Sequence, residues 1–169
     1  ERTKQDVMHY YGVDERRITV VYQGCDAQFR NRAGEEEKKC VRAKYGLPER
    51  YVIQVGTVEK RKNLENTIRG MAHLPEDVAL VAVGRDRGYR KELDRIAAEL
   101  GLGGRIYYLE NADFRDFPAL YGGALASAYP SRYEGFGIPV LEALESGVPV
   151  VAATGSCLEE AGGEAAFYA

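Results

Sequence analysis

One stretch, residues 128–152, constrains the fold of this chain more than any other. An apolar run over residues 124–129 predicts a strand, and it ends at Pro130 in a loop that contains two glycines. Residues 139–146 favour a short helix with a proline at its first position, and a β-branched run over residues 148–151 predicts a second strand. Strand, helix and strand in this order form the unit from which parallel α/β sheets are built.

The loop before this helix predicts an anion-binding site. Gly135 and Gly137 flank Phe136, so the chain must turn sharply where the helix begins. The first N–H groups of a helix have no partners within the helix, and the positive end of the helix dipole lies at the same place. The loop therefore presents backbone N–H groups to a negatively charged ligand.

Two carboxylates frame this expected anion site: Glu134 lies in the loop and Glu142 in the helix, eight positions later. A carboxylate repels phosphate but accepts hydrogen bonds from neutral hydroxyl groups. The spacing allows both side chains to reach the same side of a cleft. We therefore expect a ligand with phosphates in its middle and hydroxyls on both sides, and a nucleotide diphosphate sugar is such a ligand.

Apolar runs alternate with helical patterns along the rest of the chain. The expected strands cover residues 18–22, 51–55, 78–83 and 105–109, and a last strand is possible over residues 165–169. This alternation predicts an α/β fold with a doubly wound parallel sheet of the Rossmann-like type. Ligands of such sheets bind at the carboxyl ends of the strands.

The loop after residues 51–55 brings positive charge to that edge of the sheet. It opens with Gly56 and carries Arg61 and Lys62 directly before Asn63, whose side chain is expected to cap the next helix. A guanidinium and an ammonium group at this place can neutralise the charge of a diphosphate.

Composition bounds the remaining possibilities. A length of 169 residues suits one globular domain, and a net charge of −3 argues against an extended nucleic-acid interface. Three scattered cysteines suit reduced thiols and a cytoplasmic location. His9 and His73 have no metal-ligand partners nearby in the sequence, so no metal site is expected. The chain lacks an initiator Met and stops within a possible strand, so we expect it to be a piece of a longer protein.

The string EGFGIPVLEALESGVPVVA, residues 134–152, resembles the paired-glutamate motif of retaining glycosyltransferases with the two-domain GT-B fold, of the family-4 or group 1 type. The resemblance implies that the chain is the C-terminal, donor-binding half of such a protein. It also implies that Glu142 binds the ribose of the donor nucleotide and that Glu134 contacts the donor sugar. The backbone that then lies against sugar and phosphate is that of Gly135, Phe136, Gly137 and Ile138.

Two other loops are similar to the same family. The loop that contains Gly56, Arg61 and Lys62 resembles the one that clamps the donor pyrophosphate. Many members carry an arginine directly after the glycine, where this chain has Thr57, and Arg61 is the candidate to take its role. The loop around Asn111 resembles the one that packs on the nucleobase through backbone contacts.

Residues 15–26 resemble the crossing between the two domains of the family. This implies that residues 1–30 are the tail of an N-terminal acceptor domain together with the crossing. Residues 31–169 are then the donor-binding domain, cut before its C-terminal helices, and the acceptor domain is a missing partner. The sequence leaves open which base and sugar are bound and whether the parent protein associates with a membrane.

The resemblance implies retaining, metal-independent transfer of a sugar from a nucleotide diphosphate donor to an acceptor hydroxyl. Glu134, Arg61 and Lys62 are the catalytic candidates, and the two cations would stabilise charge on the leaving phosphate. The nucleotide sugar is a substrate, and no cofactor is expected. This piece alone should bind donor but transfer poorly or not at all. Two alternatives remain, a nucleotide-sugar epimerase of the same architecture and a non-catalytic nucleotide-sugar binding or regulatory module.

Overall fold

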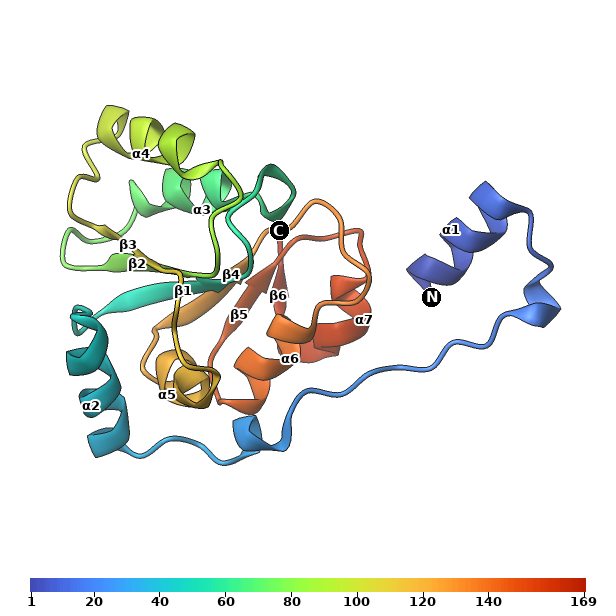
Figure 1. The fold of residues 1–169 in the computed structure, drawn as a ribbon, viewed down its shortest axis with the longest axis horizontal. Coiled ribbons are helices and arrows are strands. Elements are labelled where there is room, and N and C mark those ends of the chain that lie inside the picture. Colours follow the sequence, from blue (N-terminus) through green and yellow to red (C-terminus); the bar gives the residue numbers. More distant parts are fainter.

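A six-stranded sheet, parallel in every pairing, forms the centre of the computed structural model, which describes residues 1–169 (Figure 1). The strand order is β3-β2-β1-β4-β5-β6. The chain thus winds outward from β1 to β3, returns to the other side of β1, and winds outward again. This confirms the doubly wound parallel sheet. The strands are β1 Tyr51–Val55, β2 Ala79–Val83, β3 Ile106–Leu109, β4 Ala126–Tyr129, β5 Val150–Ala152 and β6 Phe167–Tyr168.

Helices cover both faces of the sheet. Helices α3 and α4 pack together on one face, and α2, α5, α6 and α7 form a connected layer on the other (Figure 1). None of the helices has the length and apolar character that a membrane span requires. The helices are α1 Arg2–Tyr11, α2 Glu35–Tyr45, α3 Leu64–Met71, α4 Arg90–Glu99, α5 Phe117–Gly122, α6 Ile138–Glu145 and α7 Leu158–Gly162.

Strand β2 shows why the sheet is buried on both faces. Successive side chains of a strand point to opposite faces. Leu80 and Ala82 accordingly belong to a core of 11 buried residues beneath α3 and α4. Val81 and Val83 belong to a second core of 20 buried residues beneath the other helical layer. An uninterrupted apolar run is what a strand with two buried faces needs.

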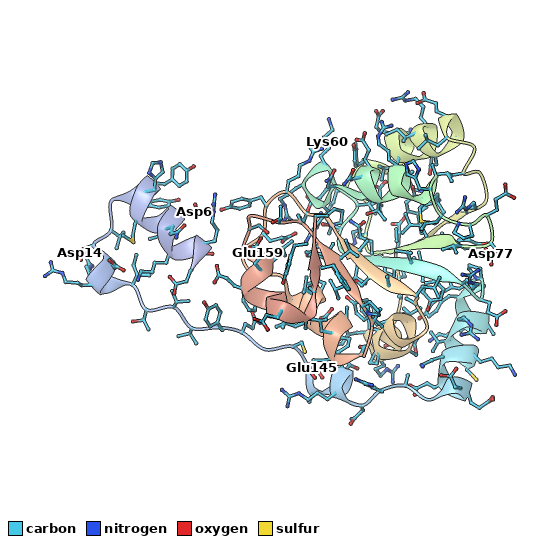
Figure 2. The ribbon with its side chains drawn as sticks, turned by 180° about the vertical axis from the view of Figure 1, so that it is seen from behind. Asp6, Asp14, Lys60, Asp77, Glu145 and Glu159 are labelled. Atoms are coloured by element: carbon cyan, nitrogen blue, oxygen red, sulfur yellow. The ribbon has the colours of Figure 1, made fainter.

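The expected strand over residues 18–22 is wrong. The segment is extended but pairs with no other strand, and 84% of Val21 is exposed. An apolar β-branched run forms a strand only beside a partner that accepts its backbone hydrogen bonds, and no strand of this chain lies there. Figures 1 and 2 show the segment running from the domain to α1, which lies to one side of it.

A short 3₁₀ turn, Ala27–Arg30, marks where the chain joins the domain. Phe29 in this turn is fully buried, and its ring lies 6.0 Å from that of Tyr121 in α5. The turn therefore packs as part of the domain core. The division of the chain at residue 30 stays a prediction.

Candidate functional site

The loops that follow β1 and β4 meet at the carboxyl edge of the sheet. The chain after β1 enters α3 on one face, whereas the chain after β4 enters α6 on the other, so the winding direction changes between these two strands. Such a change of winding direction is where open α/β sheets bind ligands. The N–H of Arg132 donates to the carbonyl of Arg61 at 2.9 Å, which holds the two loops together.

Asn63 joins the loops in a second way. Its backbone has φ 55°, and its side chain makes no capping bond to α3, so the expected cap is wrong. Instead, Nδ2 donates to the carbonyl of Pro130 at 3.0 Å. The left-handed backbone turns this amide away from the helix and toward the neighbouring loop, and Asn tolerates that conformation better than most residues.

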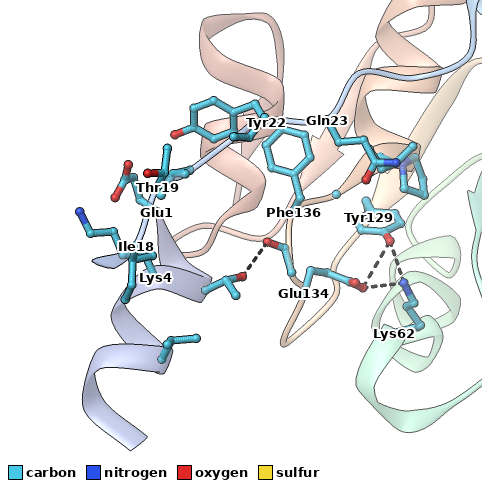
Figure 3. Close-up of a pocket in the computed structure, with 18 residues that line it drawn as sticks. Glu1, Lys4, Ile18, Thr19, Tyr22, Gln23, Lys62, Tyr129, Glu134 and Phe136 are labelled. Atoms are coloured by element: carbon cyan, nitrogen blue, oxygen red, sulfur yellow. Dashed lines mark hydrogen bonds and ion pairs between the residues drawn. The ribbon is translucent and has the colours of Figure 1, made fainter. Parts of the chain in front are cut away.

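The three catalytic candidates, Glu134, Arg61 and Lys62, lie together in one ion cluster. Oε1 of Glu134 lies 2.6 Å from Nζ of Lys62 (Figure 3). Its Oε2 lies 3.0 Å from Nη1 of Arg61. The hydroxyl of Ser131 donates to Oε1 at 2.5 Å. The hydroxyl of Tyr129 accepts from Lys62 at 2.8 Å and lies 3.3 Å from Oε1. Two cations and two hydroxyls thus converge on one carboxylate.

The cluster keeps Glu134 ionised. Burial alone would raise the pKa of this carboxyl, but hydrogen bonds from Lys62 and Ser131 and the charges of Lys62 and Arg61 outweigh it, so the pKa lies below its usual value. Tyr129 is 2% exposed, and burial, followed by the charge of Glu134, raises its pKa. Tyr129 is therefore a neutral hydroxyl between two charged groups.

Gly56 and Gly84 let the ends of β1 and β2 approach closely. A Cβ at Gly84, where φ is 147°, would lie 2.2 Å from the carbonyl oxygen of Gly56. Gly56 also has φ 147°, and a Cβ there would lie 3.3 Å from Cε of Lys62. Only glycine fits both positions without strain. Gly56, which was expected in the site, thus lies beside the Lys62 side chain and does not line the neighbouring pocket.

A pocket of about 610 Å³ lies beside the ion cluster. The loop from Gly135 to Ile138 forms one wall, and α1 with the extended segment forms the other (Figure 3). The N–H groups of Phe136, Gly137 and Ile138 donate to no protein acceptor. Helix α6 begins at Ile138, so these N–H groups form its N-terminal end. The loop therefore presents free N–H groups at a helix N-terminus, and anion binding there stays a prediction.

The extended segment contacts this loop through residues that the sequence analysis did not select. The rings of Tyr22 and Phe136 lie 5.5 Å apart, and the hydroxyl of Tyr22 donates to Glu160 at 3.0 Å. From α1, Asp6 accepts from the hydroxyl of Tyr133 at 2.8 Å, and Asp6 lies on the side of the helix that faces the domain (Figure 2). In the sequence, only the tyrosines in and near these segments could have indicated the contacts.

Glu142 is not among the residues that line the pocket. It is 9% exposed and accepts a hydrogen bond from the hydroxyl of Tyr121 at 3.1 Å, and no cation lies within ion-pair distance. Burial raises the pKa of Glu142, the Tyr121 bond opposes this, and Asp26 adds to it. The two glutamates of the motif thus have opposite environments, one with two cations and one with none.

Asn111 is exposed in the loop after β3 and does not line the pocket either. Tyr129, Ser131 and Glu59 are the residues of the cluster that the sequence analysis missed. Glu59 accepts from Nη2 of Arg61 at 2.8 Å. No group of three or more His, Cys, Asp or Glu side chains is placed to hold a metal ion.

A parallel sheet with two cations and a free helix N-terminus near its switch point places the chain in the class of doubly wound α/β domains, which bind their ligands at this edge of the sheet. Comparison with known proteins narrows the class. The family model for group 1 glycosyl transferases matches residues 37–164, and the chain belongs to this family. This membership favours a glycosyltransferase over an epimerase or a regulatory module.

Two curated relatives are similar over most of the chain. The O-antigen chain mannosyltransferase B of Escherichia coli is 31% identical over 174 residues, which cover 99% of this chain and 45% of that protein. The D-inositol 3-phosphate glycosyltransferase of Mycobacterium bovis is 35% identical over 154 residues, which cover 88% of this chain and 32% of that protein. The chain therefore spans less than half the length of these relatives.

A solved structure with the same fold contains a ligand. Anabaena HepE in complex with UDP-glucose matches with a TM-score of 0.81 and 26% identity, over 95% of this chain and 45% of that one. The match confirms the Rossmann-like α/β fold, which this chain shares with just under half of that structure.

Proposed function

We propose that this chain is the donor-binding domain of a retaining glycosyltransferase that uses a nucleotide diphosphate sugar. The observation that carries the proposal is one pocket, near the switch point between β1 and β4, that Lys62 and the N-terminal end of α6 both line, with Arg61 paired to Glu134 beside it. Two cations and three unpaired N–H groups suit a diphosphate. The UDP-glucose bound to the Anabaena relative supports the same class of donor.

In the proposed reaction, the sugar leaves the donor phosphate for an acceptor hydroxyl with retained configuration. Arg61, Lys62 and the N–H groups from Phe136 to Ile138 stabilise the negative charge that develops on the leaving diphosphate. Glu134 accepts hydrogen bonds from sugar hydroxyls, and Glu142 accepts from the ribose. Gly56 places Lys62, and Asn111 lies near the base. No metal or cofactor takes part.

Residues 1–30 are proposed to be the tail of an acceptor domain and the crossing, and residues 31–169 the donor-binding domain. Acceptor groups come from the N-terminal domain, so this chain alone should bind donor without appreciable transfer. The cytoplasmic location is kept as part of the proposal, because Cys25, Cys40 and Cys157 are all free thiols.

Calorimetric titration of the chain with UDP, GDP, ADP and their sugars tests the proposal. We expect at least one nucleotide series to bind, with an affinity that EDTA does not change. Lys62→Met should weaken binding about tenfold or more, since it removes a charge-assisted contact to phosphate. Lys39→Met, an exposed lysine of α2 without an ion pair, is the matched control. Binding of none of the ligands would refute the donor site.

Glu142→Ala separates the two glutamate roles. It should weaken bare nucleotides and nucleotide sugars alike, because both carry the ribose. A loss confined to the nucleotide sugars would contradict the ribose assignment.

A further inference from the structure

The anion that Arg61 and Lys62 bind in this structure is Glu134. The three side chains are partly or largely withdrawn from water, with 40%, 12% and 11% of their surfaces exposed for Arg61, Lys62 and Glu134. Ion pairs that are shielded to this degree are screened less by salt than surface pairs. The Lys62 contact is a charge-assisted hydrogen bond at 2.6 Å, and Arg61 adds an ion pair at 3.0 Å.

The donors of both cations are mostly in use. Lys62 has three N–H donors and directs two of them to Glu134 and to the hydroxyl of Tyr129. Arg61 donates through Nη1 to the carbonyl of Tyr133 and through Nη2 to Glu59, besides its pair with Glu134. Two carboxylates therefore balance two cations, and an incoming diphosphate meets a cluster whose charge is already neutralised.

We infer that Glu134 competes with the donor diphosphate for Arg61 and Lys62, and that this competition makes the site selective for sugar-bearing diphosphates over bare nucleoside diphosphates. The inference rests on the proposed function and concerns the same site. A diphosphate that takes the two cations must move the like-charged Glu134 away from them. With a sugar donor, the released carboxylate gains neutral hydroxyl partners, whereas a bare nucleoside diphosphate offers none at that position.

Local structure allows Glu134 to change partners. Its Oε1 also contacts two neutral hydroxyls, those of Ser131 at 2.5 Å and Tyr129 at 3.3 Å, which remain available without a cation. Gly135 follows directly, and nothing lies within 4 Å of where its Cβ would be. After transfer, the same competition favours release of the nucleoside diphosphate product, because Glu134 loses the sugar and regains both cations.

Glu134→Gln tests the inference, because it removes the competing charge and keeps the shape. UDP, UDP-glucose and inorganic pyrophosphate are titrated into the wild-type chain and the variant at one fixed, low ionic strength. We expect UDP and pyrophosphate to bind the variant about tenfold more tightly, which corresponds to about 1.4 kcal/mol. The ratio of UDP-glucose to UDP affinity should fall by a similar factor. Glu164→Gln, an exposed glutamate without an ion pair, should change neither quantity.

The outcomes separate this inference from the proposed function. Equal or weaker binding of UDP and pyrophosphate by Glu134→Gln, with a native circular dichroism spectrum, overturns the inference while wild-type binding of UDP-glucose leaves the donor site intact. An unchanged affinity ratio overturns the selectivity. If the wild type binds no nucleotide, the proposed function fails, and the pyrophosphate titration alone decides whether Glu134 competes with diphosphate.

Discussion

Glu142→Gln is the substitution whose effect follows most directly from the geometry. The carboxylate is 9% exposed and has one hydrogen-bond donor, the Tyr121 hydroxyl at 3.1 Å, but no cation in ion-pair range. Withdrawing a charge from water without a counter-charge is costly. Glutamine has nearly the same shape, and its Oε1 can accept the same bond from Tyr121. The variant should therefore be more stable than the wild type at neutral pH.

The magnitude follows from two opposing terms. The unpaired buried charge costs several kcal/mol, and one hydrogen bond to a charged group returns roughly 1.5–3 kcal/mol. A net gain of about 1 kcal/mol is expected for the variant, within the range of single stabilising substitutions. In a domain of this size, 1 kcal/mol corresponds to about 2–4 °C in Tm.

The gain should depend on pH. Burial raises the pKa of Glu142 in the folded state. Below the pKa of the unfolded state, about 4.3, the carboxyl is protonated in both states and the folded chain keeps its full stability. As pH rises through the folded-state pKa, the buried group ionises and that stability is lost. Wild type and Glu142→Gln should thus be about equally stable near pH 4 and diverge above it. Urea unfolding of both chains between pH 4 and 8, with Glu164→Gln as control, measures the difference. A variant less stable than wild type at pH 7 would refute the reasoning.

Three further predictions concern packing and exposure. Gly84→Ala should destabilise the chain by roughly 2–4 kcal/mol in urea unfolding, because the new Cβ would lie 2.2 Å from the carbonyl of Gly56 at φ 147°. Tyr51→Phe should cost about 1–2 kcal/mol, since the buried hydroxyl donates to the carbonyl of Leu120 at 2.7 Å. Trypsin should cut first after Arg17, in an exposed segment without strand pairing, and mass spectrometry should find the remainder intact.

Each of the two substitutions has a control in the same chain. Gly103→Ala should be nearly neutral, because nothing lies within 4 Å of its Cβ position. Tyr10→Phe should be neutral because Tyr10 is 74% exposed. Equal losses for a variant and its control would contradict the packing argument. First cleavage inside the sheet would contradict the exposure argument.

The sheet could be predicted from the sequence because strands such as β1 and β2 have a recognisable apolar pattern. Residues 79–83 are an unbroken apolar run, and residues 51–55 are apolar except for the buried Gln54, a pattern typical of buried parallel strands. Residues 18–22 carry the same pattern and form no strand. An apolar pattern indicates that a segment can form a strand, but it does not show whether a partner strand lies beside that segment in the fold. The last strand, Phe167–Tyr168, forms because β5 offers it a free edge.

The site could be predicted only in part. Ligands of parallel sheets bind at the carboxyl ends of the strands, which places the loops of Arg61, Lys62 and Glu134 at the same edge. The structure has the three side chains in contact there. The sequence does not specify that the cations bind the glutamate itself, because ion pairing depends on side-chain positions across two loops. Tyr129 was recoverable in principle: it ends β4 on the buried side of the alternation, so its hydroxyl had to find a polar partner at that edge.

The pKa values of the two glutamates of this short motif are shifted in opposite directions. The two side chains should therefore affect the pH dependence of binding differently. Cations hold the pKa of Glu134 below its usual value, whereas burial raises that of Glu142. As pH falls, Glu142 therefore gains its proton first and loses the charge with which it would hold ribose hydroxyls. Glu134 is still ionised then and still neutralises both cations. Any weakening of UDP-glucose binding on mild acidification should for that reason come from Glu142, because the diphosphate of UDP-glucose, unlike the terminal phosphate of UDP, gains no proton in that range. Glu142→Gln should remove this pH dependence while Glu134→Gln leaves it in place.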